Sequence, residues 1–230
     1  MTTYQDYIKN KRVIFVGASP IMIRLGEGPK IDSYDVVVRT NGSIWLIHQK
    51  DFQVDYGKRC DVLYTNNQFY REMRPLPVSE FRKNGLKFLR MKTCRPSDFQ
   101  EYNHHVGTDI IRDAIHEVDK KISGATMGLY LIQDILNCNP ESLMVTGIDF
   151  FISKKKVFEH DNYREYYPGY LPDKIREQGN RINAGKVEDG HNLHDANKIM
   201  FDLFKQGAIQ FPQYIADLLK DIIDGNIKQQ

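Results

Sequence analysis

The chain has 230 residues, a length that fits one domain or one domain with a lid, and 41% hydrophobic residues suffice for a packed core. Its formal net charge of +2 is close to balance and gives no reason to expect a nucleic-acid partner. The three cysteines, Cys60, Cys94 and Cys138, form no CxxC pair, which argues against a disulfide framework and a structural zinc site. We therefore expect free thiols in a reducing, cytoplasmic setting.

The start of the chain is polar and no long apolar run occurs anywhere in the sequence. The opening residues, MTTYQDYIKNKR, do not have the charged and apolar regions of a signal peptide. A membrane-spanning helix needs about 20 mostly apolar residues, and the sequence has no such stretch. We expect a naturally soluble protein.

The first third of the chain predicts a short helix and then three short strands. The helix is expected within residues 3–11, and apolar runs predict strands at 13–16, 35–39 and 60–64. In open α/β sheets, ligands bind at the carboxyl ends of the strands. The polar residues that follow these three strands, and that are therefore expected at the ligand-binding edge, are Gly17, Ser19, Asn41 and Asn66.

Helices and strands alternate through the rest of the chain. We expect strands at 85–91 and 143–151 and helices at 69–73, 108–118, 129–136, 192–205 and 214–223, with 44–49 either helix or loop. Thr108 or Asp109 is expected to cap the helix at 108–118. This alternation predicts an α/β fold with a mostly parallel sheet flanked by helices.

Residues 154–190 form a long polar stretch, rich in Tyr, Asn, Gly and charge. An ordinary connection in a compact domain is much shorter. The stretch is either a mobile lid over a substrate or a long surface loop without a role in substrate binding.

The stretch from Lys11 to Asn66 resembles the long sialyl motif of the animal-type sialyltransferases, glycosyltransferase family 29. That motif runs as a hydrophobic strand, Val-Gly-x-Ser, a Gly before Ile-Asp, a hydrophobic pair before Arg-x-Asn, and Asp-x-Gly-x-Lys or Arg. The bacterial sialyltransferases of family 42 share a looser version of it. The matching residues are Val16, Gly17, Ser19, Gly28, Ile31, Asp32, Ser33, Asp35, Val38, Arg39, Asn41, Asp55, Gly57 and Lys58.

The resemblance implies a single Rossmann-like domain over residues 1–230, in the GT-A-like variant of these enzymes. It implies an inverting, metal-independent glycosyltransferase that moves sialic acid from CMP-sialic acid to an acceptor sugar hydroxyl. Gly17 and Ser19 would approach the donor, and Asn41 and Asn66 would contact its nucleotide. No cofactor besides the donor substrate is implied.

A second motif combines Ser123-Gly124 with the later run Gly147-Ile148-Asp149-Phe150, and it resembles the short sialyl motif in its family 42 wording. Ser123 and Gly124 are expected to open a helix, where unpaired N–H groups attract an anion such as the donor phosphate. The alternative is an ordinary Ser-Gly helix start. Asp149 is assigned to the substrate site, because the chain has no Asp-x-Asp metal motif.

A third motif, around Gly190-His191, resembles the very short sialyl motif, where a His is the proposed general base. By that resemblance His191 takes the proton of the acceptor hydroxyl, a task suited to a side chain whose free pKa is near neutrality. Family 29 has a carboxylate five positions later, where this chain has Ala196. The nearest acids are Asp195, Glu188 and Asp189, of which Asp195 could still orient the imidazole, and His194 is a competing base.

Leaving-group stabilisation in both families comes from a His or Tyr between the second and third motifs. His160 with Tyr163 is the loose match to family 29, and Tyr166 and Tyr167 are the alternatives. The cations of the first motif are expected to be structural. Lys58, Arg59 and Arg39 would pair with Asp32, Asp35 or Asp55.

Three other functions remain open at this point. The first is the same site with another CMP-activated ulosonic acid, such as CMP-Kdo, because nothing in the sequence specifies the sugar. The second is a non-catalytic nucleotide-binding module with the same fold. A dinucleotide-dependent oxidoreductase is disfavoured, because Gly17-Ala18-Ser19 lacks the full GxGxxG. The acceptor, the linkage and the oligomeric state are not specified by the residues.

Overall fold

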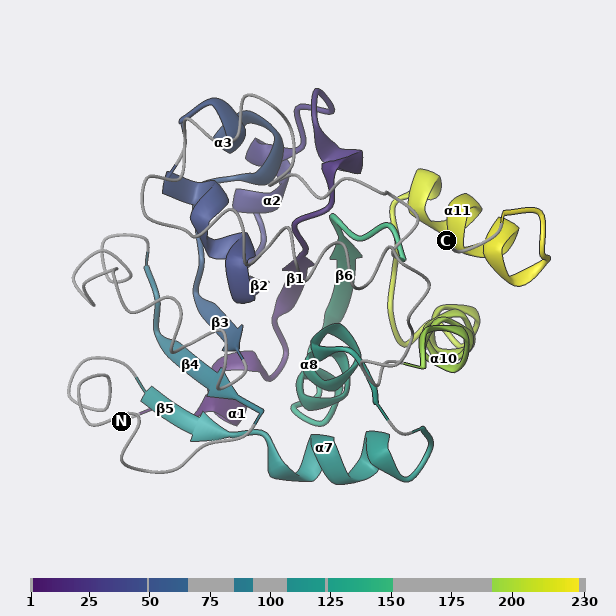
Figure 1. Ribbon diagram of the computed structural model, residues 1–230. Helices are drawn as coiled ribbons and strands as arrows, with labels where there is room; N and C mark the ends of the chain where they lie inside the picture. Colours follow the sequence, from purple (N-terminus) through teal and green to yellow (C-terminus); the bar gives the residue numbers. More distant parts are fainter. Residues whose placement is uncertain are drawn as a thin grey trace, which may run out of the picture.

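The computed structural model describes residues 2–48, 50–65, 85–92, 107–122, 124–150 and 192–227. Within these ranges the strands form one parallel sheet of six, in the order β5-β4-β3-β2-β1-β6 (Figure 1). This confirms the expected α/β, Rossmann-like fold. The strands are β1 (Arg12–Val16), β2 (Val36–Thr40), β3 (Val62–Thr65), β4 (Phe88–Met91), β5 (Gly107–Ile110) and β6 (Ser142–Thr146).

Helices cover both faces of the sheet, which is why β1 and β2 are continuous apolar runs rather than alternating ones. On one face, Ile14, Val16 and Val37 pack with Leu46 and Tyr56. The elements on that face are η1 (Pro20–Met22), α2 (Gly28–Asp32), η2 (Asn41–His48) and α3 (Lys50–Tyr56).

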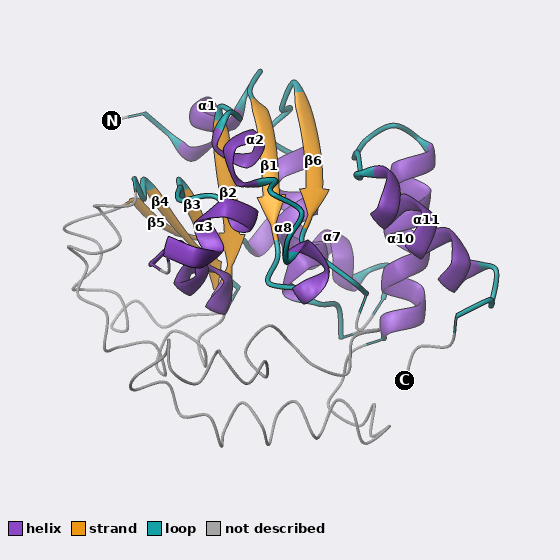
Figure 2. Ribbon diagram, turned by 90° about the horizontal axis from the view of Figure 1, so that it is seen from above, coloured by secondary structure: helices purple, strands orange, loops and turns teal. Residues whose placement is uncertain are grey.

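The opposite face carries the larger core, in which Val13, Phe15 and Val38 pack beneath the remaining helices. In both views α10 and α11 lie together beside β6, at the far end of the sheet from β5 (Figure 2). The helices on this side are α1 (Tyr4–Ile8), α7 (Arg112–Asp119), α8 (Met127–Leu136), α10 (Leu193–Lys205) and α11 (Gln213–Ile223).

The start of the expected helix at 108–118 is wrong. Residues 107–110 form the edge strand β5, which pairs Thr108 with Leu89 of β4, and α7 begins only at Arg112. Its N-cap is Ile111 and no side chain caps it, so neither Thr108 nor Asp109 has the predicted role. The helical spacing from Ile111 onward is real, since Ala114 and Val118 are buried with it.

Most other elements lie where they are expected, but two strands are shorter. The strand expected at 143–151 ends at Thr146, because Gly147 has a left-handed backbone, and the strand expected at 85–91 begins only at Phe88. The opening helix is confirmed as α1, and the ambiguous residues 44–49 begin within the 3-10 helix η2. The helix expected at 69–73 and the possible lid at 154–190 lie outside the described residues. In the described part of the chain, no helix combines the length and apolar character needed to cross a bilayer.

A buried ion pair that the sequence did not predict ties four elements together on the larger-core side. Arg90 of β4 makes a bidentate contact with Asp134 of α8, with Nε–Oδ2 at 3.0 Å and Nη2–Oδ1 at 2.9 Å. The Tyr64 hydroxyl donates to the same carboxylate at 2.6 Å and also pairs with the Tyr4 hydroxyl of α1. The Arg90 guanidinium lies over the Tyr4 ring, 4.1 Å from its centroid.

Cys60 and Cys138 are free and buried, as expected, while Cys94 lies outside the described residues. Burial raises the pKa of the Cys60 thiol to about 12 and that of Cys138 to about 11. Because only the neutral thiol fits these sites, the folded state holds protons that the unfolded chain releases near its ordinary pKa of about 8.5.

We therefore expect the stabilising effect of each thiol to be complete below about pH 8.5 and to be lost as the pH rises toward the folded pKa. Denaturant unfolding at about pH 8 and about pH 10.5 checks this, with an expected loss of order 2 kcal/mol per thiol. Cys60→Ala should lose less stability than the wild type over that interval. An equal loss in both proteins would contradict the expectation.

Candidate functional site

The carboxyl ends of β1 and β6 form the topological switch point of the sheet. From β1 the chain proceeds outward to β5 and then returns to β6 on the other side of β1. Open α/β sheets bind ligands at such a point. Two of the sequence motifs have a turn there, since Gly17 follows β1 and Gly147 follows β6.

The two turns at the switch point touch through their backbones. The Gly17 N–H donates to the Thr146 carbonyl at 2.9 Å, and the Ser19 N–H donates to the Gly147 carbonyl at 2.8 Å. A Cβ on Gly17 would lie 2.2 Å from the Gly147 oxygen, and Gly147 itself has a φ of +66°. The first and second motifs therefore require glycine here so that their two turns can pack against each other.

Ser19 takes part in this turn with its side chain as well. Its hydroxyl accepts from the Ile21 N–H at 3.3 Å and so caps η1, and the residue is only 8% exposed. The structure thus gives the Ser19 hydroxyl an internal role, and a contact between Ser19 and a donor substrate stays a prediction.

Two non-glycine residues at this edge have left-handed backbones. Asn41, directly after β2, has a φ of 44°, and Phe150, after Asp149, has a φ of 53°. Asn tolerates this conformation well, but for a bulky aromatic residue it is an outlier, and such strain concentrates at functional sites. Of the predicted residues, Asn41 opens η2 with a left-handed backbone, and Asp149 directly precedes the left-handed Phe150.

The charge of Asp149 reaches the buried Tyr56 hydroxyl. Burial is the main cause that raises the pKa of Tyr56, and the charges of Asp55, Tyr214 and Asp149 add to it. Tyr214 of α11 approaches the same edge, with its hydroxyl 3.2 Å from Thr146 Oγ1. Sequence reasoning missed both tyrosines, because neither occupies a fixed position of the motifs.

The second motif does not open a helix as expected. Gly124 has a φ of +69°, and α8 begins at Met127 after the N-cap Thr126, three residues beyond Gly124. Left-handed backbone cannot belong to a right-handed helix, so Gly124 forms the turn that precedes α8. The first turn of α8 nevertheless reaches β1, since a Cβ on Gly128 would lie 3.7 Å from the Phe15 ring.

The third motif meets the second at the start of α10. The Asn192 N–H donates to the Gly124 carbonyl at 3.3 Å. The Asn192 side chain caps α10 by accepting from the Asp195 N–H, and its Nδ2 donates to the Asp195 carboxylate at 2.6 Å. Asp195, the acid expected to orient His191, is thus bound to the cap residue.

Five of the predicted site residues lie outside the described residues, so their roles stay predictions. They are Asn66, Ser123, His160, Tyr163 and His191. Among the described residues, Gly17 and Ser19 contact the end of β6 two to three residues before Asp149, and Asn192 brings the end of the third motif to Gly124. No three His, Cys, Asp or Glu side chains gather as metal ligands within the described ranges.

The acids of the first motif bind backbone N–H groups rather than the expected cations. The Asp55 carboxylate accepts from the N–H groups of Arg24 and Gly26, each at 2.8 Å. Asp32 accepts from those of Lys58 and Arg59, at 3.0 and 3.1 Å. The Asp55 contacts fix the loop that precedes α2 and the Asp32 contacts fix the loop that follows α3, and the predicted ion pairs of Asp32 and Asp55 are wrong.

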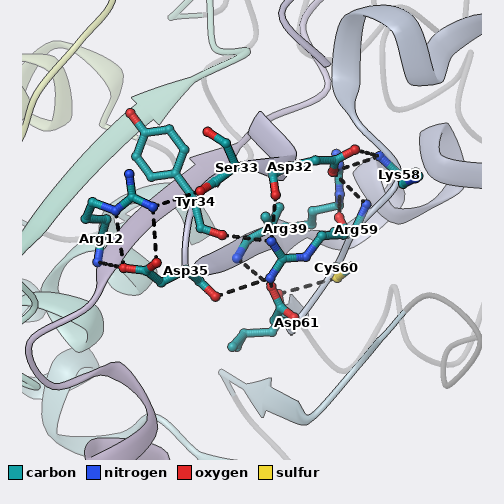
Figure 3. A network of polar contacts seen from close by, with 12 residues as sticks. Arg12, Asp32, Ser33, Tyr34, Asp35, Arg39, Lys58, Arg59, Cys60 and Asp61 are labelled. Atoms are coloured by element: carbon teal, nitrogen blue, oxygen red, sulfur yellow. Dashed lines mark hydrogen bonds and ion pairs between the residues drawn. The ribbon is translucent and has the colours of Figure 1, made fainter. Parts of the chain in front are cut away.

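The two arginines of the motif are structural, but their partners also differ from those expected (Figure 3). Arg39 is fully buried, and it donates to the carbonyls of Arg59 at 2.8 Å and Tyr56 at 2.5 Å. Burial lowers its pKa to about 10. Arg59 forms an ion pair with Asp61 at 2.8 Å, and Asp35 pairs with Arg12 at 3.1 Å.

No protein-family model matches the sequence, and no curated protein matches it either. Solved structures do match. The sialyltransferase CstII from Campylobacter jejuni, in complex with the substrate analogue CMP-3FNeuAc, aligns with a TM-score of 0.50 at 14% identity over 87% of this chain and 78% of that one. Its complex with cytidine-5'-monophosphate aligns with a TM-score of 0.53 at 12% identity, over 88% and 79%.

A mammalian sialyltransferase in complex with Gal-beta-1-3GalNAc-ortho-nitrophenol aligns with a TM-score of 0.53 at 13% identity, over 91% of this chain and 72% of that one. The fold is that of the sialyltransferases. At these identities the likeness concerns the fold alone. The structural similarity extends to both the bacterial and the animal-type enzymes that the sequence motifs resemble.

Proposed function

We propose that the protein is an inverting, metal-independent glycosyltransferase that moves sialic acid from CMP-sialic acid to an acceptor sugar hydroxyl. The observation that carries the proposal is the meeting of the motif turns at the switch point of a sialyltransferase fold, through the contact between Gly17 and Thr146 and that between Ser19 and Gly147. The similar bacterial enzyme was solved with CMP and with a CMP-sugar analogue, and the mammalian one with an acceptor analogue.

In the proposed reaction, His191 takes the proton of the acceptor hydroxyl. The acceptor oxygen then bonds to the anomeric carbon of sialic acid, while the bond from that carbon to the phosphate oxygen breaks and its electron pair leaves with CMP. The transition state is oxocarbenium-like, as in other glycosyl transfers. His160 or Tyr163 would donate a hydrogen bond to the departing phosphate, where negative charge develops.

The donor would lie across the edge formed by Gly17, Ser19, Asn41 and Asn66, with its phosphate toward Ser123 and Gly124 and with Asp149 on the sugar side. Amide side chains such as those of Asn41 and Asn66 donate and accept at once, which suits a cytosine edge or ribose hydroxyls.

A non-catalytic nucleotide-binding module is the second candidate. One observation favours it: Ala196 stands where family 29 has a carboxylate, and Asp195 is bound to Asn192. A module of this kind would bind CMP without turning over a CMP-sugar.

Calorimetric titration with CMP, UMP and NAD in the absence of metal tests the site. We expect CMP to bind selectively and CMP-sialic acid to be hydrolysed slowly without acceptor. His191→Ala should lower that hydrolysis and the transfer by about 10²-fold or more with CMP affinity unchanged, because a general base contributes about that factor.

The matched control is His194→Ala, which removes an exposed imidazole from the first turn of α10. If His194→Ala loses the activity instead, the base has been misassigned. CMP binding without turnover in the wild type would favour the binding module, and NAD binding without CMP binding would refute the transferase proposal.

A further inference from the structure

In the turn after β1, residues 17–20, which we call the first turn, most polar groups form hydrogen bonds with other parts of the protein. The N–H groups of Gly17 and Ser19 bond to carbonyls at the end of β6, and Pro20 has no N–H. Among the contacts of the described residues, the Ala18 N–H has no acceptor. Ala18 is partly exposed, so its N–H is the backbone donor that this turn can offer to a ligand.

The Ser19 carbonyl is held from the other side by Tyr56, the last residue of α3. The Tyr56 hydroxyl donates to that carbonyl at 2.5 Å, across 37 residues of sequence. Tyr56 is fully buried, and burial raises the pKa of its hydroxyl well above the ordinary value, so the group is a neutral donor at physiological pH.

Tyr56 is itself fixed by its surroundings. Its ring packs edge-on against Phe52, with centroids 6.2 Å apart, and its carbonyl accepts from the buried Arg39. It lies in the core cluster that also contains Val16 and Met22, which flank the first turn. The Arg39, Tyr56 and Ser19 contacts therefore form one rigid connection from the middle of the sheet to the switch point.

We propose that Tyr56 is a positioning residue of the donor site. Its hydroxyl fixes the Ser19 carbonyl and with it the turn that presents the Ala18 N–H to the CMP-sugar. This inference rests on the proposed function. Without the hydroxyl, the Ser19 carbonyl, which belongs to the N-cap of η1, loses the only side-chain donor that the described residues provide.

Tyr56→Phe tests the proposal, because it keeps the ring and removes only the hydroxyl. The matched control is Tyr34→Phe, since no hydrogen bond of the Tyr34 hydroxyl occurs within the described part of the chain. Hydrogen–deuterium exchange, measured well below the Tm of each variant, should be several-fold faster at the Ser19 and Ile21 amides in Tyr56→Phe than in the wild type or Tyr34→Phe.

Titration with CMP gives the functional half of the test. We expect Tyr56→Phe to bind CMP about tenfold more weakly, with a raised KM for the donor and a smaller change in kcat, and Tyr34→Phe to match the wild type. Unchanged amide exchange, or faster exchange with an unchanged CMP Kd, would overturn the proposal. A wild type that does not bind CMP would refute the proposed function, and with it any donor role of Tyr56, while the exchange data would still show whether Tyr56 fixes the turn.

Discussion

Gly17→Ala is expected to destabilise the protein by at least about 3 kcal/mol and to eliminate CMP binding, because overpacking against backbone leaves little room for relaxation. The added methyl would lie 2.2 Å from the Gly147 carbonyl oxygen and 2.9 Å from its carbon. Both neighbours are backbone atoms held by the pairing of β1 with β6, so the two strand ends would have to separate. That separation would break the contact on which the proposed donor site depends.

Gly147→Ala should have a comparable effect for two reasons. Its φ of +66° is strained for alanine, and its Cβ would meet the Gly17 oxygen and the Met22 sulfur, each at 2.8 Å. Gly207→Ala is the matched control, because Gly207 has a φ of +73° but nothing within 4 Å of the added Cβ. This control therefore measures only the cost of placing alanine at a positive φ, about 1 kcal/mol.

Denaturant unfolding and CMP titration of the three variants measure both effects. Gly207→Ala should bind CMP as the wild type does. Its free energy of unfolding should fall only by the cost of placing alanine in a left-handed backbone. If Gly17→Ala loses no more stability than Gly207→Ala, the contact between the turns at Gly17 and Gly147 can accommodate a methyl group. These turns would then not require glycine for their close approach.

Sequence reasoning located the sheet and the switch point because both depend on local patterns. The runs around Val13, Val36 and Val62 are apolar throughout, as strands covered on both faces must be. The glycines after β1 and β6 mark tight turns, and they meet there. The fold class follows from this alternation, and the resemblance to sialyltransferases led to the fold that the structural comparisons show.

The misplaced elements have local physical causes. β5 is a four-residue edge strand, and its Ile110 continues the helical spacing of α7, so the pattern could not separate the two. Ser123 and Gly124 are expected to open a helix, whereas the left-handed backbone of Gly124 places it in the turn before α8. Residue types alone do not report the sign of φ.

The partners predicted for Asp32, Asp55 and Arg39 are wrong because the true partners of these three residues are backbone groups. Asp32 and Asp55 bind N–H groups, and Arg39 binds carbonyls. Every residue carries such groups, so no sequence pattern marks them. The contact of Tyr56 with Ser19 is hidden for the same reason, since its acceptor is a carbonyl.

The second large effect is expected at the buried pair of Arg90 and Asp134. Arg90 and Asp134 are 6% and 7% exposed. Burial acts to lower the pKa of Arg90, but the charge and hydrogen bonds of the Asp134 carboxylate outweigh it and raise the pKa above its ordinary value. Asp134→Asn should cost about 3–5 kcal/mol, because it leaves the guanidinium buried without its counter-charge. Arg90→Met should cost a similar amount by leaving the carboxylate without its cation.

The double variant Arg90→Met with Asp134→Leu should recover most of that loss, because well-packed apolar residues often replace a buried ion pair without cost. The hydroxyls of Tyr4 and Tyr64 would still pair with each other after the replacement. A double-mutant cycle by denaturant unfolding measures the coupling. A double variant less stable than either single one would contradict the argument.

The same variants separate stability from function. Asp134 is the eighth residue of α8, well beyond the turn at Gly124 and on the opposite face of the sheet from Tyr56. CMP affinity measured below the unfolding midpoint should therefore be unchanged in Asp134→Asn, whereas Gly17→Ala should lose it. If both substitutions weaken CMP binding in proportion to their loss of stability, nucleotide binding reports the stability of the whole sheet rather than the geometry of the switch point, and the assignment of the donor site to Gly17 and Gly147 fails.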